Sequence, residues 1–323
     1  MDTISGENEL LLTCAQTPEG IAILRCQTRD DTVRLPDEIG GRPVVSLGDY
    51  VLAERAPDLK GHNTFAMRVT CGGDTPVHDA NAVRRVVLPA HCRSLGSYAF
   101  YNCRRLERLE VGAALADVGG GALMNCRALR TFVLHAAPDA PTALPKLLGE
   151  TATEVDVRFD HGAPARLLFP AYSEELEDLS PAHVFQRRIH GAGYLYRQCF
   201  AGGALQFAQY DKALAALLER HDFTVAARVA VRRLALPYAL GDAAREDYLN
   251  CLRAHGGALA CKMAEAGESS ALHFLLTLGV LSPEAIGTAC DAARRHGQTA
   301  ALSVLLAASG GNQAAGRAKT FDL

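Results

Sequence analysis

A segment recurs at a constant interval in the first half of the chain, and this repeat limits the possible folds more than any other feature. The strand-like stretches Arg85–Leu88, Arg108–Val111 and Thr131–Leu134 begin at successive steps of a 23-residue repeat. One such repeat cannot bury its own apolar face, but stacked copies can, so we expect a short solenoid. The same interval pairs further positions: Leu95 with Val118, Gly96 with Gly119, Ala99 with Ala122, Phe100 with Leu123, Asn102 with Asn125, Cys103 with Cys126, and Leu106 with Leu129.

Each repeat can be explained position by position. The alternating residues predict a strand with one buried face, and the glycines suit tight turns. The Asn-Cys pair closes the repeat, because Asn bonds turn backbone and Cys fills a small apolar space. We expect these residues in one core: Leu88, Leu95, Phe100, Leu106, Val111, Val118, Leu123 and Leu129.

The run Leu88–Leu106, which contains Leu-Gly-Ser-Tyr-Ala-Phe-Tyr-Asn-Cys, resembles the bacterial BspA-type leucine-rich repeat. An earlier copy, Leu35–Leu52, resembles the opening repeat of that family, although Val51-Leu52 replaces Ala-Phe and the Asn-Cys pair is missing. The resemblance covers roughly residues 20 to 160. It implies a binding surface, often on secreted or surface proteins, and it brings no catalytic residue.

These observations predict a leucine-rich-repeat domain over residues 1–165. Residues 54–82 interrupt the array and contain Gly72-Gly73-Asp74 and Pro76, so we interpret them as an insertion loop. A degenerate last repeat is expected at about 130–160, ending on the strand-like Glu154–Phe159.

After about residue 170 the pattern becomes helical. Ser173 and Ser180-Pro181 are candidate helix starts, and two similar stretches, 264–276 and 294–306, recur at a 30-residue spacing. They resemble ankyrin- or HEAT-type helical hairpins, although the ankyrin signature Thr-Pro-Leu-His is absent. We therefore expect an α+β, multi-domain chain with an all-α helical-hairpin array over 166–310 and a flexible tail over 311–323. The expected helices are 207–220, 224–236, 243–255, 258–266, 269–278, 283–296 and 299–308.

Aromatic residues concentrate between the two halves, over residues 184–210, and include Tyr194 and Tyr196. Such a cluster can form a packed joint between two domains. It can also form a binding groove, because aromatic residues anchor interfaces. Both interpretations stay open at this point.

Composition argues against several classes of protein. The net charge of −3 provides no basic field for a phosphate backbone, so no nucleic-acid partner is expected. The first residues lack the features of a signal peptide, and no apolar run is long enough for a transmembrane helix. We expect a cytoplasmic chain whose ten cysteines are reduced thiols without disulfides.

No motif for catalysis or cofactor binding is found. The chain has no phosphate-binding loop, no dinucleotide fingerprint and no Gly-x-Ser-x-Gly. His183 and His190 have helical spacing but no third ligand nearby, and Cys199 is the thiol we would test for reactivity. The chain is expected to be no enzyme and to hold no metal or cofactor.

Arginines at matching repeat positions suggest where a partner binds. Arg85, Arg108 and, one residue before the matching position, Arg130 are expected to form a ladder on the exposed strand face, together with Val87, Glu110 and Val133. An acidic protein partner would neutralise the ladder, although Glu107 and Glu110 could do so internally. The leading hypothesis is a non-enzymatic scaffold or adaptor. The alternatives are an enzyme or small-molecule binder with a site at the aromatic joint around Tyr194 and Tyr196, and a BspA-like surface adhesin.

Overall fold

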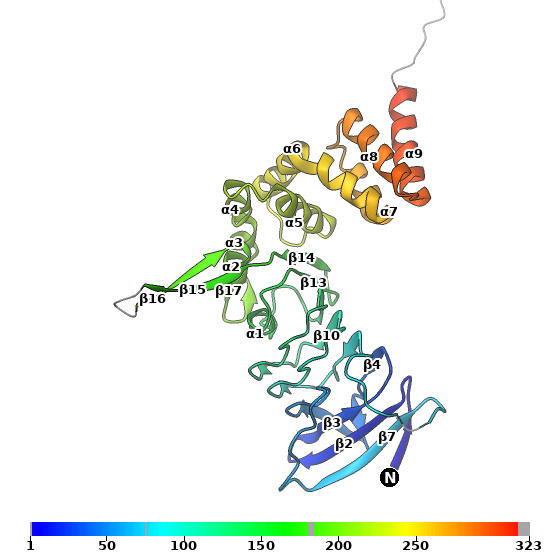
Figure 1. The fold of residues 1–323 in the computed structure, drawn as a ribbon, viewed down its shortest axis with the longest axis vertical. Helices are drawn as coiled ribbons and strands as arrows, with labels where there is room; N and C mark the ends of the chain where they lie inside the picture. Colours follow the sequence, from blue (N-terminus) through cyan, green and yellow to red (C-terminus); the bar gives the residue numbers. More distant parts are fainter. Residues whose placement is uncertain (1, 75, 180–183, 316–323) are drawn as a thin grey trace, which may run out of the picture. The chain divides into compact units, whose positions relative to one another are not determined.

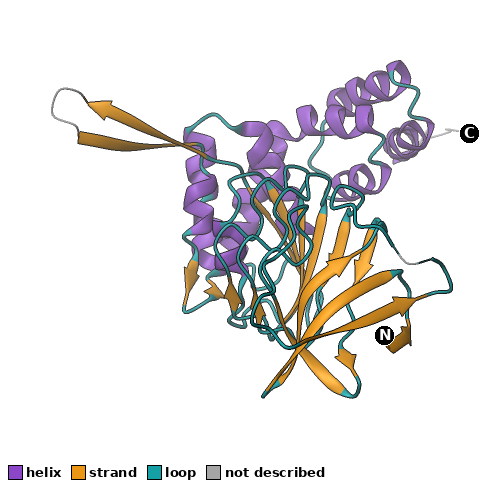
Figure 2. Ribbon diagram, turned by 60° about the horizontal axis from the view of Figure 1, so that its bottom comes forward, coloured by secondary structure: helices purple, strands orange, loops and turns teal. Residues whose placement is uncertain are grey.

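The computed structural model describes residues 2–74, 76–179 and 184–315. They form an α+β protein with two compact units, Met1–Gln206 and Phe207–Leu323. Strands dominate the N-terminal unit, and the C-terminal unit is helical in its described part (Figures 1 and 2). The boundary between these units lies at 206/207, whereas the sequence suggested 165/166.

The 23-residue repeat is confirmed in one six-stranded sheet, which we name the main repeat sheet. Arg85 pairs in register with Arg108, and Arg108 with Thr131, in parallel strands. The sheet order is β14-β13-β12-β10-β8-β4, with β14 antiparallel to β13. The strands are β4 (Thr32–Arg34), β8 (Arg85–Val87), β10 (Arg108–Gly112), β12 (Thr131–His135), β13 (Val155–Phe159) and β14 (Ala165–Phe169).

A second sheet combines the second short strand of the repeats with the N-terminal strands. Its order is β1-β7-β2-β3-β6-β9-β11, and β5 (Glu38–Ile39) pairs with β6. Short parallel strands β6 (Arg42–Leu47), β9 (Ser94–Leu95) and β11 (Asp117–Val118) come from successive repeats. The remaining strands are β1 (Asp2–Ser5), β2 (Leu10–Thr17), β3 (Gly20–Gln27) and β7 (Thr64–Thr70).

The expected insertion at residues 54–82 is therefore more than a loop, because it contains β7. This strand pairs with β1 on one side and β2 on the other. Met67 and Val69 alternate with partly or fully exposed neighbours, and both are buried. The glycines and the proline that suggested a loop lie outside this strand.

Turn geometry explains why particular residues recur in the repeats. A Cβ atom on Gly96 or Gly119 would lie 2.4 Å from backbone of the preceding repeat, so no side chain fits there. Asn102 and Asn125 have φ of 63° and 64°, a region that Asn tolerates better than most residues. Asn125 Nδ2 also donates to Asn102 Oδ1 at 2.9 Å, which links two repeats directly.

The predicted repeat core is confirmed except at Val118. Phe100 and Leu106 are fully buried, and Leu88, Leu95, Val111, Leu123 and Leu129 are buried as well. Val118 is half-buried because the short strand β11 is the last of its sheet.

Residues 166–206 do not form the helices that the sequence suggested. Ser173 begins a strand, β15 (Ser173–Leu179), which pairs antiparallel with β16 (Val184–His190). Charged side chains pair across these two strands. The pattern of apolar residues therefore did not indicate a strand in this region. His190 lies on a strand rather than a helix, while His183 and Ser180-Pro181 lie outside the described residues. The other elements of the N-terminal unit are α1 (Leu144–Gly149), α2 (Gly193–Arg197), β17 (Phe200–Ala201) and β18 (Ala204–Leu205).

The C-terminal unit contains helices close to the expected positions. Helix α8 begins at residue 283 as expected, and the hydroxyl oxygen of Ser282 caps it by accepting from Ala285 N at 3.1 Å. The seven helices of its described residues are α3 (Phe207–Lys212), α4 (Leu214–Glu219), α5 (Phe223–Ala235), α6 (Asp242–Ala266), α7 (Ser269–Thr277), α8 (Pro283–Arg295) and α9 (Thr299–Ala315).

Two of the helix ends expected from the sequence, at residues 255 and 308, are wrong. Helix α6 runs through Gly256 and Gly257, where added Cβ atoms would lie 3.1 Å from Leu281 and Ala285, so these glycines permit close packing. Helix α9 continues past Ser309-Gly310-Gly311. Residues 311–315 of the expected tail therefore belong to α9, and the rest lie outside the described part.

The 30-residue spacing corresponds to two helical hairpins with matching turns. Gly267 and Gly297 adopt φ of 71° and 66° between their helices. The backbone bond from Glu268 N to Met263 O recurs from Gln298 N to Ala293 O. Leu275 and Leu305, which match at the same spacing, are both fully buried.

Candidate functional site

The outward side of the main repeat sheet carries rows of polar residues, and we call this surface the strand face. One row runs through Thr32, Arg85, Arg108, Thr131 and Asp156, on successive strands. Neighbouring parallel strands lie about 4.8 Å apart, so these side chains lie close together. The row mixes positive, neutral and negative groups.

The expected ladder of three arginines is wrong at its third position. Thr131, not Arg130, pairs with Arg108 in the sheet. Arg130 is exposed, and its guanidinium donates to the carbonyl oxygens of Arg127 and Leu129. The sequence placed Arg130 one residue before the matching position, and in a strand such an offset moves a side chain out of the row.

A second row of the strand face is more buried than expected. Val87, Glu110 and Val133 were predicted to be exposed, but each has a relative exposure of 6% or less. Glu110 is covered by the side chains of Arg85 and Arg108, which bond its carboxylate. The accessible charged groups at the centre of this face are therefore the arginines, whose side chains are 39% and 35% exposed.

Glu110 organises the charges at the centre of the strand face. Its Oε1 accepts hydrogen bonds from Arg85 Nε and, at 2.7 Å, from Arg108 Nε. Burial alone would raise the pKa of Glu110, but the hydrogen bond from Arg85 and the charge of Arg108 hold that pKa below its ordinary value. Glu110 thus neutralises the positive charges of Arg85 and Arg108 within the chain, which is one of the two alternatives that the sequence left open.

His135 and Asp160 extend this cluster to the next strands. The His135 ring lies 3.5 Å from Glu110 Oε2 through Nε2 and 2.9 Å from Asp160 Oδ2 through Nδ1. At the neighbouring edge, Asp156 accepts two hydrogen bonds from Arg166, at 3.0 and 2.7 Å. The strand face consequently carries both signs of charge rather than being uniformly basic.

The aromatic candidates differ from each other in accessibility. Tyr194 is half-exposed, with Arg187 5.6 Å above its ring and the Tyr172 ring at 5.8 Å. Tyr196 is fully buried, so the expectation that it contacts a partner is wrong. The two residues lie in the short helix α2, where a spacing of two places side chains on different sides.

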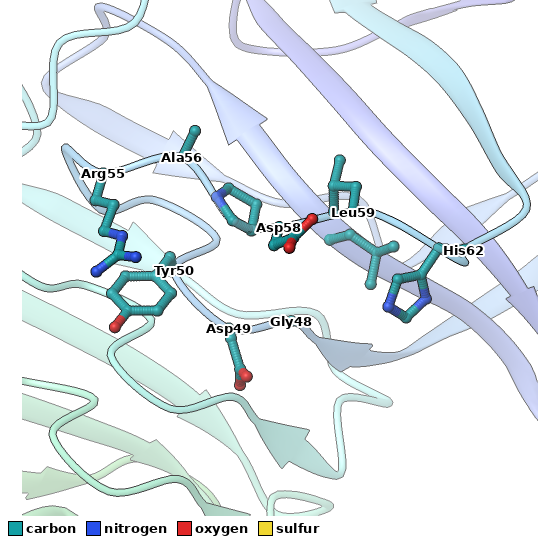
Figure 3. A pocket seen from close by; sticks show the side chains of 10 residues that line it. Gly48, Asp49, Tyr50, Arg55, Ala56, Asp58, Leu59 and His62 are labelled. Carbon is teal, nitrogen blue, oxygen red and sulfur yellow. The ribbon is translucent and has the colours of Figure 1, made fainter.

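A cavity that the sequence did not suggest lies beside the first repeat (Figure 3). It has a volume of about 560 Å³, and Leu24, Pro57 and Leu59 give it an apolar part. Its polar part consists of Asp49, Tyr50, Arg55, Asp58 and His62.

The tyrosine of this cavity belongs to a stacked cluster. The ring of Tyr50 stacks on Tyr98 at 5.2 Å, and Tyr101 meets both rings edge-on. Tyr50 and Tyr98 hold equivalent turns in two repeats, and each has positive φ. The equivalent turn of the next repeat has Gly121, where a Cβ would lie 2.5 Å from the Tyr98 ring. Matching the Gly48-Asp49-Tyr50 and Gly96-Ser97-Tyr98 turns could have revealed this cluster from the sequence.

Thiol accessibility reverses the expectation for Cys199. Cys199 is buried, whereas Cys71 is exposed and its thiol lies 3.3 Å from a Glu9 carboxylate oxygen. That hydrogen bond raises the pKa of Cys71, so it opposes a reactive thiolate. Cys103 and Cys126 are buried as predicted, and burial raises the pKa of Cys126 to about 12.

No group of three or more His, Cys, Asp or Glu side chains among the described residues could hold a metal ion. None of the helices described is both long enough and apolar enough to cross a bilayer.

Comparisons with known proteins give two matches, both among solved structures. The chain is similar to bacterial leucine-rich-repeat proteins. The T. pallidum leucine rich repeat protein is 23% identical over 38% of this chain and 50% of its own, with a TM-score of 0.29. A leucine rich cell surface protein from Faecalibacterium prausnitzii A2-165 is 17% identical over 41% of this chain and 36% of its own, with a TM-score of 0.23. The chain thus spans half or less of each. No protein-family model and no curated protein matches the sequence.

Proposed function

We propose that this chain is a non-enzymatic interaction protein that binds another protein through the strand face. The proposal rests mainly on Arg85 and Arg108, which lie side by side on neighbouring strands. Both guanidiniums remain partly exposed, and both bond the carboxylate of Glu110. Guanidinium groups fixed in this way lose little conformational entropy when they bind a carboxylate. The matching partner surface contains acidic groups opposite these arginines.

The architecture behind this proposal is a short BspA-like solenoid followed by an ankyrin-like helical array. Three features support the solenoid: the 23-residue period, the parallel register and the linked turns of successive repeats. The recurring glycine turns at 267 and 297 support the array. Stacked repeats offer long surfaces relative to their mass, which suits a scaffold or adaptor.

The proposal is tested by affinity capture from the native organism with three proteins: the unchanged chain, Arg85→Glu/Arg108→Glu, and the control Arg104→Glu/Arg105→Glu. Arg104 and Arg105 are exposed and lie in the same repeat but outside the strand of the main repeat sheet. We expect a partner that the unchanged chain and the control capture and the strand-face variant loses. Equal capture by all three proteins, at low salt where screening is weak, would place the binding surface elsewhere.

We also propose that the chain works in the cytoplasm, without a cofactor, rather than as a surface adhesin. Detection of the native protein in the soluble cytosolic fraction and its absence from the cell surface would support this location. Surface labelling of the intact cell that modifies Cys71, the exposed thiol, would favour the adhesin.

The cavity beside Tyr50 favours a second candidate function, the binding of a small molecule. Its size and its mixture of apolar and charged groups suit an organic ligand with several polar groups. Thermal-shift screening with a metabolite library tests this, with Asp49→Asn and Tyr50→Phe as site variants. Stabilisation that these variants remove would support the candidate, and stabilisation that they leave unchanged would exclude this cavity.

A further inference from the structure

The hairpin β15–β16 is a two-stranded sheet with an unequal distribution of charge. Strand β15 contains Glu174, Glu175, Glu177 and Asp178 and no basic residue. Strand β16 contains Arg187, Arg188 and His190 and no acidic residue. One edge of the hairpin is therefore acidic and the other is basic.

Cross-strand ion pairs hold the two strands in register. Arg187 Nε donates to Glu174 Oε2 at 2.9 Å, and Arg188 Nη2 lies 2.7 Å from Glu177. His190 Nε2 lies 3.1 Å from Glu175 Oε2. In these pairs, each carboxylate of β15 lies beside a basic group of β16. A further strand at either edge of the hairpin could form the same kind of pairs.

Both outer edges of this hairpin are available. Among the described strands, none pairs with β15 or β16 except the other. The ribbon extends away from the other strands of its unit in both views (Figures 1 and 2). Leu176, at the middle of β15, is 74% exposed. Isolated two-stranded ribbons are marginally stable in water, and unpaired edges invite further strands.

We propose that the acidic edge of this hairpin pairs with the basic edge of the same hairpin in a second copy of the chain. The added strand extends the sheet through backbone hydrogen bonds, and it sets carboxylates of one copy beside guanidiniums of the other. Shielding of Leu176 by the neighbouring copy adds to the stability of this contact.

The charge distribution also selects the symmetry of the contact. A two-fold dimer would pair β15 with β15 or β16 with β16, which sets like charges side by side. Pairing of β15 in one copy with β16 in the other uses different surfaces of the two copies. The resulting dimer keeps one free acidic edge and one free basic edge. Association therefore continues beyond a dimer with rising concentration, unless a ring closes.

Sedimentation velocity on the full chain tests this proposal, with concentration and salt as variables. We expect the mean mass to rise with concentration at low salt and to fall when salt screens the charges. The variant Glu174→Lys/Glu175→Lys/Glu177→Lys makes both edges basic, and Arg187→Glu/Arg188→Glu makes both acidic. Each alone should stay monomeric, and an equimolar mixture should associate.

A charge-swapped variant that combines both sets of substitutions separates association from loss of the hairpin. It keeps two of the three cross-strand pairs, Arg187 with Glu174 and Arg188 with Glu177, with their charges exchanged. It also keeps complementary edges, so it should associate as the unchanged chain does. A monomeric swapped variant, a mixture that fails to associate, or an unchanged chain that stays monomeric at low salt would overturn the proposal.

Amide hydrogen exchange provides a second measurement that needs no substitution. In the unchanged chain, exchange in residues 173–179 and 184–190 should slow as protein concentration rises. Exchange there that is independent of concentration, while the mass rises, would show that association uses another surface and would overturn the edge pairing.

Discussion

The N-terminal repeats and the C-terminal helical hairpins solve the same problem of stacking in different ways. In the N-terminal unit, successive repeats touch through their backbones, and the turns at Gly96 and Gly119 leave no space for a side chain. In the C-terminal unit, the two hairpins bury apolar side chains at matching positions, such as Leu275 and Leu305.

This difference decides how strictly each region constrains its sequence. A close backbone contact or a positive φ restricts a position to very few residue types, so Gly and Asn recur at equivalent positions of successive repeats. A side-chain contact between helices accepts several apolar residues, so the similarity of the two hairpins is weaker in the sequence than in the fold.

Replacement of Phe100 by Ala should lower the free energy of unfolding of the N-terminal unit by about 3–5 kcal/mol, because this fully buried ring leaves a cavity. Urea denaturation followed by circular dichroism measures the loss. The neighbouring Tyr101→Ala is the matched control, since Tyr101 is half-exposed. Losses of equal size at the two positions would contradict the repeat core.

Replacement of Leu275 by Ala should cost about 2–4 kcal/mol in the C-terminal unit. Leu305→Ala should cost a similar amount, because Leu305 is equally buried at the matching position of the second hairpin. Thermal denaturation of the two variants measures both losses. A loss at only one of the two positions would show that the hairpins do not share an equivalent core position.

Replacement of Asn125 by Ala should cost about 1–2 kcal/mol, because Ala tolerates φ of 64° poorly and cannot bond Asn102. Asn125→Gly should recover part of the loss, since glycine adopts this φ without strain. Chemical denaturation of both variants tests the point. If Gly were as damaging as Ala, backbone conformation would not be the reason for the recurring Asn.

The smallest effect concerns acid stability and Glu110. Because its pKa is below the ordinary value of 4.5 in the folded chain, ionised Glu110 stabilises the fold above that pH. The contribution is lost as pH falls through the folded pKa. Glu110→Gln should therefore lose less stability than the unchanged chain between about pH 5 and pH 3. Parallel pH profiles would show that the arginines do not hold this carboxylate.

The same contrast explains what the sequence could predict. Positions with a strict backbone requirement were predicted correctly, including the core at Phe100 and the strand register of Arg85 with Arg108. Helices with capping residues were also found, as at Ser282. The glycines at 256 and 257 misled because a glycine permits close helix packing as readily as it ends a helix.

Features that depend on distant parts of the chain could not be predicted. Strand β7 lies in the supposed insertion, and its pairing with β1 and β2 depends on residues far away in the sequence. The burial of Glu110 required two arginines on adjacent strands to cover it. Arg130 lies one residue before the matching repeat position in the sequence. In a strand this offset turns the side chain away from the row, and Thr131 pairs with Arg108 instead.

The central claim, that the strand face is the partner-binding surface, is tested most directly by amide hydrogen exchange on the chain with its captured partner. The account predicts slower exchange in the partner complex over β8, β10 and β12, at residues 85–87, 108–112 and 131–135, with little change in α6–α9. Slower exchange confined to other segments, with those three strands unchanged, would contradict it.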